Sequence, residues 1–306
     1  RSRLWQPKIG AKWQIILDGV PDTKRSTLLP NDAHIWDIDL WDASAADITA
    51  LKKANKKVIC YFSAGTSESW RPDYNELKKY NLGKVCKDDK CKGSWGGEEW
   101  LDIRTEKVRK VMQTRIKLAS QKGCDAVDPD NVDGYDNPIK DTKTGTITRF
   151  QQADSVQFLK FIADDAARYN MSMGLKNSLA LIPKIQNYVQ FAVNEECVKV
   201  KECDGYKNFL ASGKPVFHIE YTNAAKSGGR VGYKDPSAST KKYCNPFREA
   251  VSRFSTIIKA GETLGPNYLY CDGKPADMTP IRANSNSKGR YADNADNDSL
   301  TVEGED

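Results

Sequence analysis

Short apolar runs alternate with amphipathic segments along most of the 306 residues. Several of these runs are apolar on both faces, as expected for parallel strands that helices cover. The predicted strands are Trp13–Asp18, Ile35–Leu40, Lys57–Ser63, Cys124–Asp128, Met171–Lys176, Val189–Asn194, Pro215–Glu220 and Ser255–Lys259. The predicted helices between them include Ala45–Ala54, Glu106–Lys122, Phe150–Tyr169 and Pro246–Phe254.

Eight strand–helix units in succession predict an α/β fold of the (β/α)8 TIM-barrel type, formed by a single domain over residues 1–271. A doubly wound open sheet is the alternative. It usually carries a Gly-rich phosphate loop after its first strand, and none is present there. Thr66–Glu99 is expected to be a long loop, and Asp272–Asp306 a polar, disordered tail. Trp100–Arg104 is either a ninth short strand or an extended lead-in to the next helix.

The most informative segment is the acidic end of the fourth predicted strand. There a short apolar run ends in Asp128, Asp130 and Asp133. Side chains alternate faces along a strand, so Asp128 and Asp130 share one face, and their repulsion raises the pKa of one of them. The alternatives are a polar loop or a Ca²⁺ site. The EF-hand pattern fails, because Val132 stands where that loop needs an oxygen ligand and Asp133 where it needs Gly.

Nearly every other predicted strand also ends in polar groups, and barrel enzymes carry their active sites at these ends. The candidate substrate-binding residues are Asp18, Asp37, Asp39, Tyr61, Ser63, Trp70, Lys176, Asn194, Glu220 and Tyr221. Glycoside hydrolysis needs two carboxylates that flank the scissile bond, and the chain supplies them in excess. The aromatic residues near the loops either stack on sugar rings or belong to the core: Trp36, Trp41, Trp70, Trp95 and Tyr221.

Other chemistries find less support. A serine triad needs a histidine, and neither His34 nor His218 lies near a Gly-x-Ser-x-Gly elbow. The net charge is +6, but the basic residues are scattered and no nucleic-acid-binding motif is present. The sequence contains no run of 18 apolar residues, so no membrane span is predicted. We therefore expect no nucleic-acid partner, no metal and no cofactor.

The eight cysteines include no CxxC pair, which makes a Cys/His zinc site improbable and favours disulfides in a secreted protein. Cys86 with Cys91 and Cys197 with Cys203 are close enough to staple small loops, and Cys244 with Cys271 to tie down the C-terminal segment. Cys60 and Cys124 are expected to be buried free thiols on strands. Sequons at Asn170 and Asn297 fit a secretory route, and the start at Arg1 fits a trimmed mature form.

Several segments, in this order, resemble glycoside hydrolase family 114, the endo-α-1,4-polygalactosaminidases of fungi and bacteria. They are Trp13–Gly19, Trp36–Leu40, Val58–Gly65, Ser69–Asp73, Trp100–Arg104, Gly123–Asn131, Gly174–Asn177, Asn194–Cys197 and Ile219–Tyr221. The resemblance extends from about Trp13 to Leu264, and the cysteines resemble those of the fungal branch.

The resemblance implies a (β/α)8 barrel that cuts internal α-1,4 linkages of galactosamine-rich polysaccharide such as galactosaminogalactan, a biofilm polymer. It also implies a catalytic Asp at the fourth strand and a catalytic Glu at the sixth. The Glu corresponds to Glu195. The Asp corresponds to Asp130, with Asp128 as the competing candidate. We expect a secreted monomer with a retaining mechanism. The alternatives are a non-catalytic polysaccharide-binding barrel and a metal-dependent deacetylase, which a chelator would inactivate.

Overall fold

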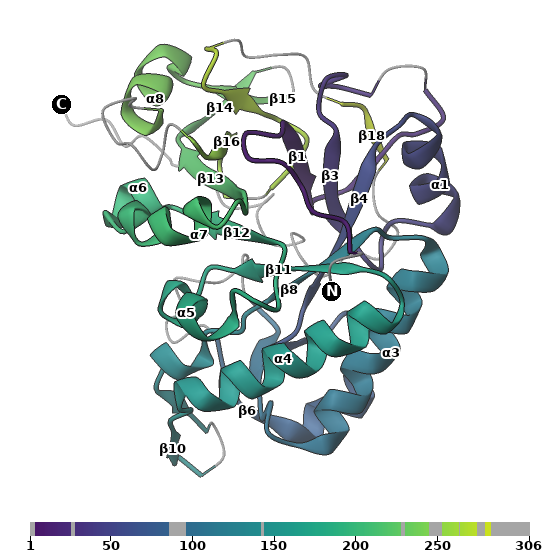
Figure 1. Cartoon of the computed structure of the whole chain (residues 1–306), viewed down its shortest axis with the longest axis vertical. Coiled ribbons are helices and arrows are strands. Elements are labelled where there is room, and N and C mark those ends of the chain that lie inside the picture. Colours follow the sequence, from purple (N-terminus) through teal and green to yellow (C-terminus); the bar gives the residue numbers. More distant parts are fainter. Residues whose placement is uncertain are drawn as a thin grey trace, which may run out of the picture.

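The computed structural model describes residues 4–25, 28–85, 96–141, 144–227, 230–244, 253–262, 264–273 and 279–282. Its centre is a curled sheet of nine strands, eight of them parallel (Figure 1). The order is β1 (Trp13–Ile16), β3 (Ile35–Asp39), β4 (Lys57–Ser63), β8 (Ala126–Asp130), β11 (Ser172–Lys176), β12 (Phe191–Glu195), β13 (Val216–Thr222), β16 (Ser255–Ala260) and antiparallel β17 (Leu269–Tyr270). The eight predicted strands and the TIM-like barrel are confirmed. The fourth strand lies slightly later than expected, so Asp130 is part of it.

Helices cover the outside of this barrel, with α1 (Ala45–Lys53), α3 (Glu106–Lys122) and α4 (Gln152–Arg168) along β4 to β11 (Figure 1). Ser44 and Asp47 form a capping box at the start of α1, and Thr105 caps α3, which ends at Gly123 in a left-handed conformation. Most of the predicted helix Pro246–Phe254 lies outside the described residues. The helices are α1 (Ala45–Lys53), α2 (Tyr74–Leu77), α3 (Glu106–Lys122), α4 (Gln152–Arg168), α5 (Ile182–Ile185), α6 (Cys197–Val200), α7 (Lys207–Ala211) and α8 (Pro236–Tyr243).

The segment expected to be one long loop is partly regular structure. A three-stranded antiparallel sheet consists of β5 (Thr66–Glu68), β7 (Glu98–Leu101) and β6 (Asn81–Lys84). The Trp100 segment is therefore a strand, but it belongs to this side sheet and not to the barrel. The other short strands form pairs: β9 (Ile139–Lys140) with β10 (Ile147–Thr148), β14 (Ala224–Ser227) with β15 (Arg230–Tyr233), and β2 (Val20–Pro21) with β18 (Ile281–Arg282).

The last of these pairs lies in the segment expected to be a tail. β18 pairs with β2, and Arg282 donates to Asp47 at 2.5 Å. Thr279 accepts a hydrogen bond from the backbone of Leu29 at 3.0 Å. These residues are held against the barrel, and residues 283–306 lie outside the described part.

Inside the barrel, an apolar floor lies below a polar upper layer, because the inward side chains change from apolar to polar along the strands. Trp13, Phe191 and Phe217 fill the floor. The ring centroid of Phe217 lies 5.0 Å from that of Trp13 and 5.5 Å from that of Phe191. Gly174 completes it, because a Cβ there would lie 2.4 Å from the Phe191 ring. Alternate residues point outward to a larger core beneath the helices. The inward acids Asp37, Asp39, Asp128, Asp130 and Glu195 thereby lie above this floor, toward the carboxyl ends of their strands.

A buried lysine closes the seam between the first and last parallel strands. In the described residues, β1 and β16 share no backbone ladder. The Lys259 ammonium instead donates to Gln14 Oε1 and Ile15 O at 2.7 Å, to Asn267 O at 2.8 Å and to Gly265 O at 2.9 Å. Burial lowers the pKa of Lys259 well below its ordinary value. The seam depends on one side chain that saturates several buried acceptors.

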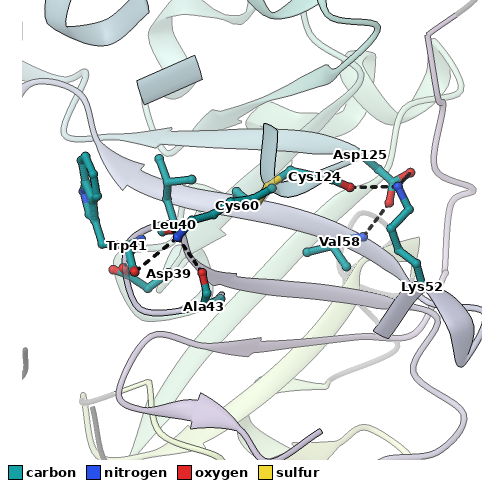
Figure 2. Close-up of a disulfide and its surroundings, with 11 residues drawn as sticks. Asp39, Leu40, Trp41, Ala43, Lys52, Val58, Cys60, Cys124 and Asp125 are labelled. Carbon is teal, nitrogen blue, oxygen red and sulfur yellow. Dashed lines mark hydrogen bonds and ion pairs between the residues drawn. A yellow bond between two sulfur atoms is a disulfide. The ribbon is translucent and has the colours of Figure 1, made fainter. Parts of the chain in front are cut away.

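Among the described residues, three disulfides reinforce the periphery. Cys60 and Cys124 are bonded, which corrects the expectation of free thiols. Figure 2 shows the reason: Cys60 points outward from β4 toward Cys124 just before β8, while Asp125 accepts from Val58 N at 3.1 Å on the same edge. Cys197–Cys203 and Cys244–Cys271 are confirmed. Cys86 and Cys91 lie outside the described residues.

None of the described helices combines the length and the apolar character that crossing a membrane would require.

The seam generates a stability prediction. Lys259→Met keeps the volume but removes the lysine donor from the buried carbonyls of Ile15, Gly265 and Asn267, so we expect a loss of about 2–4 kcal/mol in the free energy of unfolding. Urea denaturation followed by tryptophan fluorescence measures it. Lys53→Met, on the exposed face of α1, is the control and should change stability by less than about 0.5 kcal/mol. Equal effects of the two substitutions would contradict the role given to Lys259.

Candidate active site

The polar upper layer of the barrel is built around Lys176, the last residue of β11. Its side chain is 2% exposed, and its ammonium lies 3.0 Å from Asp130 Oδ2 and 3.2 Å from Glu195 Oε2. Burial disfavours the charged lysine, but the negative charges of Asp130, Glu195 and Asp128 outweigh burial and raise its pKa well above the ordinary value. The cation is therefore permanent and joins two carboxylates from different strands.

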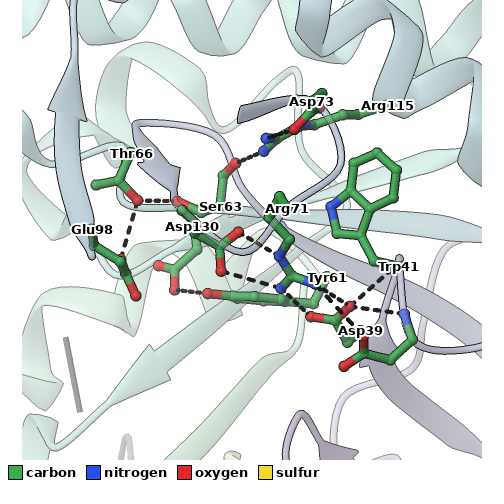
Figure 3. A network of polar contacts seen from close by, with 12 residues as sticks. Asp39, Trp41, Tyr61, Ser63, Thr66, Arg71, Asp73, Glu98, Arg115 and Asp130 are labelled. Atoms are coloured by element: carbon green, nitrogen blue, oxygen red, sulfur yellow. Dashed lines mark hydrogen bonds and ion pairs between the residues drawn. The ribbon is translucent and has the colours of Figure 1, made fainter. Parts of the chain in front are cut away.

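Asp130 is fixed by its neighbours on β4 and by the turn that follows β8. Tyr61 Oη donates to its Oδ2 at 2.8 Å (Figure 3). The backbone of Asn131 donates to its Oδ1 at 2.7 Å. Asn131 has φ 58°, and its side chain donates to Ser63 at 2.9 Å. Gly65 permits this turn, because a Cβ there would lie 1.6 Å from Asn131 O. The carboxylate thus has one orientation, with its side chain 13% exposed.

Glu195, at the end of β12, is held by Asn177 and Tyr221. Asn177 Nδ2 donates to Glu195 Oε2 at 3.1 Å, and Asn177 Oδ1 accepts from Glu195 N at 2.8 Å. Tyr221 Oη donates to Glu195 Oε1. Burial opposes ionisation, but Lys176, Tyr221 and Asn177 together lower the pKa of Glu195. Its side chain is 24% exposed, compared with 13% for that of Asp130.

Three further acids adjoin this site, and their pKa values are raised whereas that of Glu195 is lowered. Burial raises the pKa of Asp128 to about 7, with Asp130 and Glu195 adding to the shift against the opposing pull of Lys176. Burial and the adjacent Asp128 raise the pKa of Asp37 well above its ordinary value. Burial and Asp130 raise that of Asp133 to about 6. The barrel end therefore holds carboxyl groups whose pKa values are shifted in opposite directions.

The two carboxylates at Lys176 are close together. The distance between Asp130 Oδ2 and Glu195 Oε2 cannot exceed the sum of their distances to the Lys176 ammonium. That sum is below the roughly 6.5 Å at which the separation typical of inverting glycosidases begins. Lys176 therefore holds the two carboxylates on either side of one ammonium group.

Several residues predicted from the sequence to bind substrate face away from this site. Asn194 and Glu220 have outward parity on β12 and β13 and are 1% and 0% exposed. Glu220 accepts from Val198 N at 2.7 Å and contacts His218 at 2.9 Å. Trp36 is also buried on the outer face. In this conformation these side chains support the barrel wall, and a role in binding substrate is not supported.

Asp39 faces the carboxyl end of the barrel but is neutralised there. Arg71 donates to its two oxygens at 2.8 and 2.5 Å and to Glu68 at 2.8 Å (Figure 3). Ser63 is 1% exposed and lies behind Asn131. Trp70, just before Arg71, and Asp18, after β1, are half-buried. Sequence reasoning missed the Arg71 clamp, because Asp39 is 32 residues away along the chain and no local pattern joins the two.

Residues 1–276 match the sequence profile of glycoside-hydrolase family GH114. The chain belongs to this family. As a GH114 member it is a glycoside hydrolase, in agreement with the carboxylates grouped around Lys176.

Solved structures agree with this assignment. The crystal structure of Aspergillus fumigatus Ega3 in complex with galactosamine matches with 42% identity and a TM-score of 0.73, over 87% of this chain and 97% of that one. The glycoside hydrolase domain of PelA from Pseudomonas aeruginosa matches with 10% identity and a TM-score of 0.62, over 85% and 98%, and supports the fold alone. Among curated proteins, none matches this GH114 chain significantly.

The opposed pKa shifts predict how stability depends on pH. Groups with a raised pKa, such as Asp128 and Asp133, contribute stability below about pH 4 that is lost as the pH rises through about 6–7. Groups with a lowered pKa, such as Glu195 and Asp47, contribute stability that is lost in acid. Melting temperature should therefore peak at roughly pH 4–5 and fall as the pH rises toward about 7. A maximum at or above pH 8 would contradict these shifts.

Proposed function

We propose that this GH114 enzyme cleaves internal α-1,4 linkages of galactosamine-rich polysaccharide by a retaining mechanism that uses Asp130 and Glu195. The observation that carries the proposal is the Lys176 ammonium within 3.2 Å of both carboxylates. It supports a short separation between them, which suits double displacement through a covalent glycosyl-enzyme. The similarity to Ega3, which was crystallised with galactosamine, supports the sugar.

Asp130 is proposed as the nucleophile. It is anchored by Tyr61 and Asn131, and Lys176 stabilises its negative charge. One of its oxygens would attack the anomeric carbon as the bond to the leaving oxygen breaks. The competing candidate, Asp128, is fully buried with a pKa raised to about 7, so at neutral pH it is a poorer and less accessible nucleophile.

Glu195 is proposed as the general acid and base. In the first step it gives a proton to the leaving oxygen, and in the second it removes one from the attacking water. Its lowered pKa suits the second step, because Lys176 and Tyr221 favour the anion. The first step requires prior protonation against the same contacts, which becomes easier as the pH falls. Once Asp130 is esterified, Lys176 is free to stabilise Glu195 alone.

A cationic substrate fits the charge at this end of the barrel. Asp130 and Glu195 are countered by one lysine, and Asp133 adds a third carboxyl group. The whole chain carries +6, so the acidic site lies within a basic protein. A local negative potential attracts the ammonium groups of deacetylated galactosamine and raises the rate of encounter at low salt. Asp39 does not add to this field, because Arg71 neutralises it.

We also propose that the enzyme is secreted and acts as a monomer. Three disulfides support an oxidising compartment, since such bonds rarely persist in the cytosol. The exposed Asn170 is a possible glycosylation site on the same route.

The catalytic assignment predicts the effect of nearly isosteric substitutions. Glu195→Gln should lower kcat by about 10²–10⁴-fold through loss of proton transfer. Asp130→Asn should lower it by on the order of 10⁴-fold or more through loss of the nucleophile. Asp128→Asn should cost less than either. Reducing-end assays on galactosaminogalactan, with product anomers followed by proton NMR, measure rate and stereochemistry.

Glu196→Gln is the matched control for Glu195→Gln, since Glu196 pairs with Lys199 at 2.6 Å and should matter little. If Asp128→Asn abolishes activity while Asp130→Asn retains most of it, the roles at β8 are reversed. Nearly full activity of Glu195→Gln would place the acid elsewhere. An inverted product anomer would exclude double displacement.

The charge of the site predicts a preference for deacetylated polymer. At low salt, kcat/KM should be higher for deacetylated than for fully acetylated polymer, and the difference should shrink as salt screens the attraction. Matched polymer samples that differ only in acetylation, assayed across a salt series, provide the measurement. Equal kcat/KM for both polymers at low salt would contradict the proposed attraction.

A further inference from the structure

Two buried aspartates lie inside the barrel next to the proposed catalytic residues. Asp37 is on β3 and Asp128 on β8, the two strands that flank β4. Both point into the barrel and both are 0% exposed. Asp128 precedes Asp130 by two residues on the same face of β8, so the pair lies one step deeper than the proposed nucleophile.

These aspartates are in contact with each other but receive no ordinary hydrogen bond. In the described part of the chain, all four of their carboxylate oxygens lack a donor. The two side chains nevertheless lie within hydrogen-bonding reach of one another. Two ionised carboxylates in contact repel each other, and neither can donate. A hydrogen bond between them therefore requires that one carry a proton.

Their surroundings favour one negative charge on the pair. The charged and titratable groups that act on them are Lys176, Asp130 and Glu195. Tyr61, from β4, also faces this layer, and the Lys176 ammonium lies 5.5 Å from the centre of its ring. Full ionisation would add two charges beside Asp130 and Glu195, against a single lysine. Full protonation would leave Lys176 with anions on one side only.

We propose that Asp37 and Asp128 share one proton and, as a singly charged pair, hold the Lys176 ammonium in register between Asp130 and Glu195. They are positioning residues: they touch neither substrate nor reacting atoms. A doubly charged pair would draw Lys176 down into the barrel, and a neutral pair would release it toward the catalytic carboxylates. The inference rests on the proposed roles of Asp130 and Glu195. It adds that a neighbouring buried pair sets the charge that positions Lys176 between them.

The test is a double-substitution cycle with Asp37→Asn, Asp128→Asn and both together. An amide donates to the remaining carboxylate as the shared proton does, so each single variant keeps one negative charge and should lower kcat/KM by less than about tenfold. The double variant has no charge left. Its loss should exceed the product of the two single losses by more than about tenfold, with KM little changed. Asp165→Asn, a buried acid on α4, is the control and should leave kcat/KM unchanged.

Losses that simply multiply would show two independent residues and overturn the proposal. So would a single variant as inactive as the double variant, because one charge would then not suffice. If the double variant does not fold, titration of the wild-type protein and the single variants tests the shared proton instead.

Carbon-13 NMR of aspartate-labelled protein provides this titration without reference to activity. In the wild-type protein, the two carboxyls should titrate together in two separated steps, the second near or above neutral pH. Each single Asn variant should leave one carboxyl with one step at lower pH. Titration of both carboxyls in one step near pH 4, their ordinary range, would overturn the shared proton. If coupled titration is found in a protein that hydrolyses no galactosamine polymer, the pair stands and the proposed function fails.

Discussion

The carboxyl end of this barrel depends on the ion pairs of Lys176. Several acids converge there because the parity of their strands turns them inward, and without a cation their burial would cost several kcal/mol each. Lys176 compensates Asp130 and Glu195 directly, at 3.0 and 3.2 Å, and Asp128 through space. The remaining excess is relieved by protonation, which is why the deepest acids have raised pKa values. The catalytic geometry and the electrostatics therefore have one origin.

The same barrel holds a second buried lysine with the opposite behaviour. Lys259 is surrounded by neutral acceptors, and burial lowers its pKa, whereas the anions around Lys176 raise the pKa of that residue. A side chain of one type thus serves two purposes. At the seam between β1 and β16 it replaces missing backbone bonds, and at β11 it gathers charge. Both lysines are buried, so the charge of the groups that they contact decides whether the lysine pKa is raised or lowered.

The site is also supported from outside the barrel. Arg71, presented beside the β5–β7–β6 sheet, clamps Asp39 and Glu68. Arg115, on α3, binds Asp73 at 2.8 Å and donates to the carbonyl of Ser63, which fixes the end of β4 (Figure 3). These contacts link the loops above the barrel to the strands that carry Tyr61 and Asp130. The segment between β4 and α3 is thereby fixed to the polar layer of the barrel, whose side chains must keep their positions.

The sequence by itself determined the eight strands, the barrel and the family, because two-sided apolar runs and ordered motifs are local signals. It also indicated Asp130, Lys176 and Glu195, since polar residues at strand ends are visible without a structure. The alternation of side chains along a strand is also a local signal, and it predicts that Asn194 and Glu220 point out of the barrel when Glu195 and Tyr221 point in. Only the tertiary structure decided that Cys60 meets Cys124, that Arg71 neutralises Asp39 and that Asp37 contacts Asp128. These are contacts between distant segments, and their energies depend on burial and on neighbouring charges that no local pattern encodes.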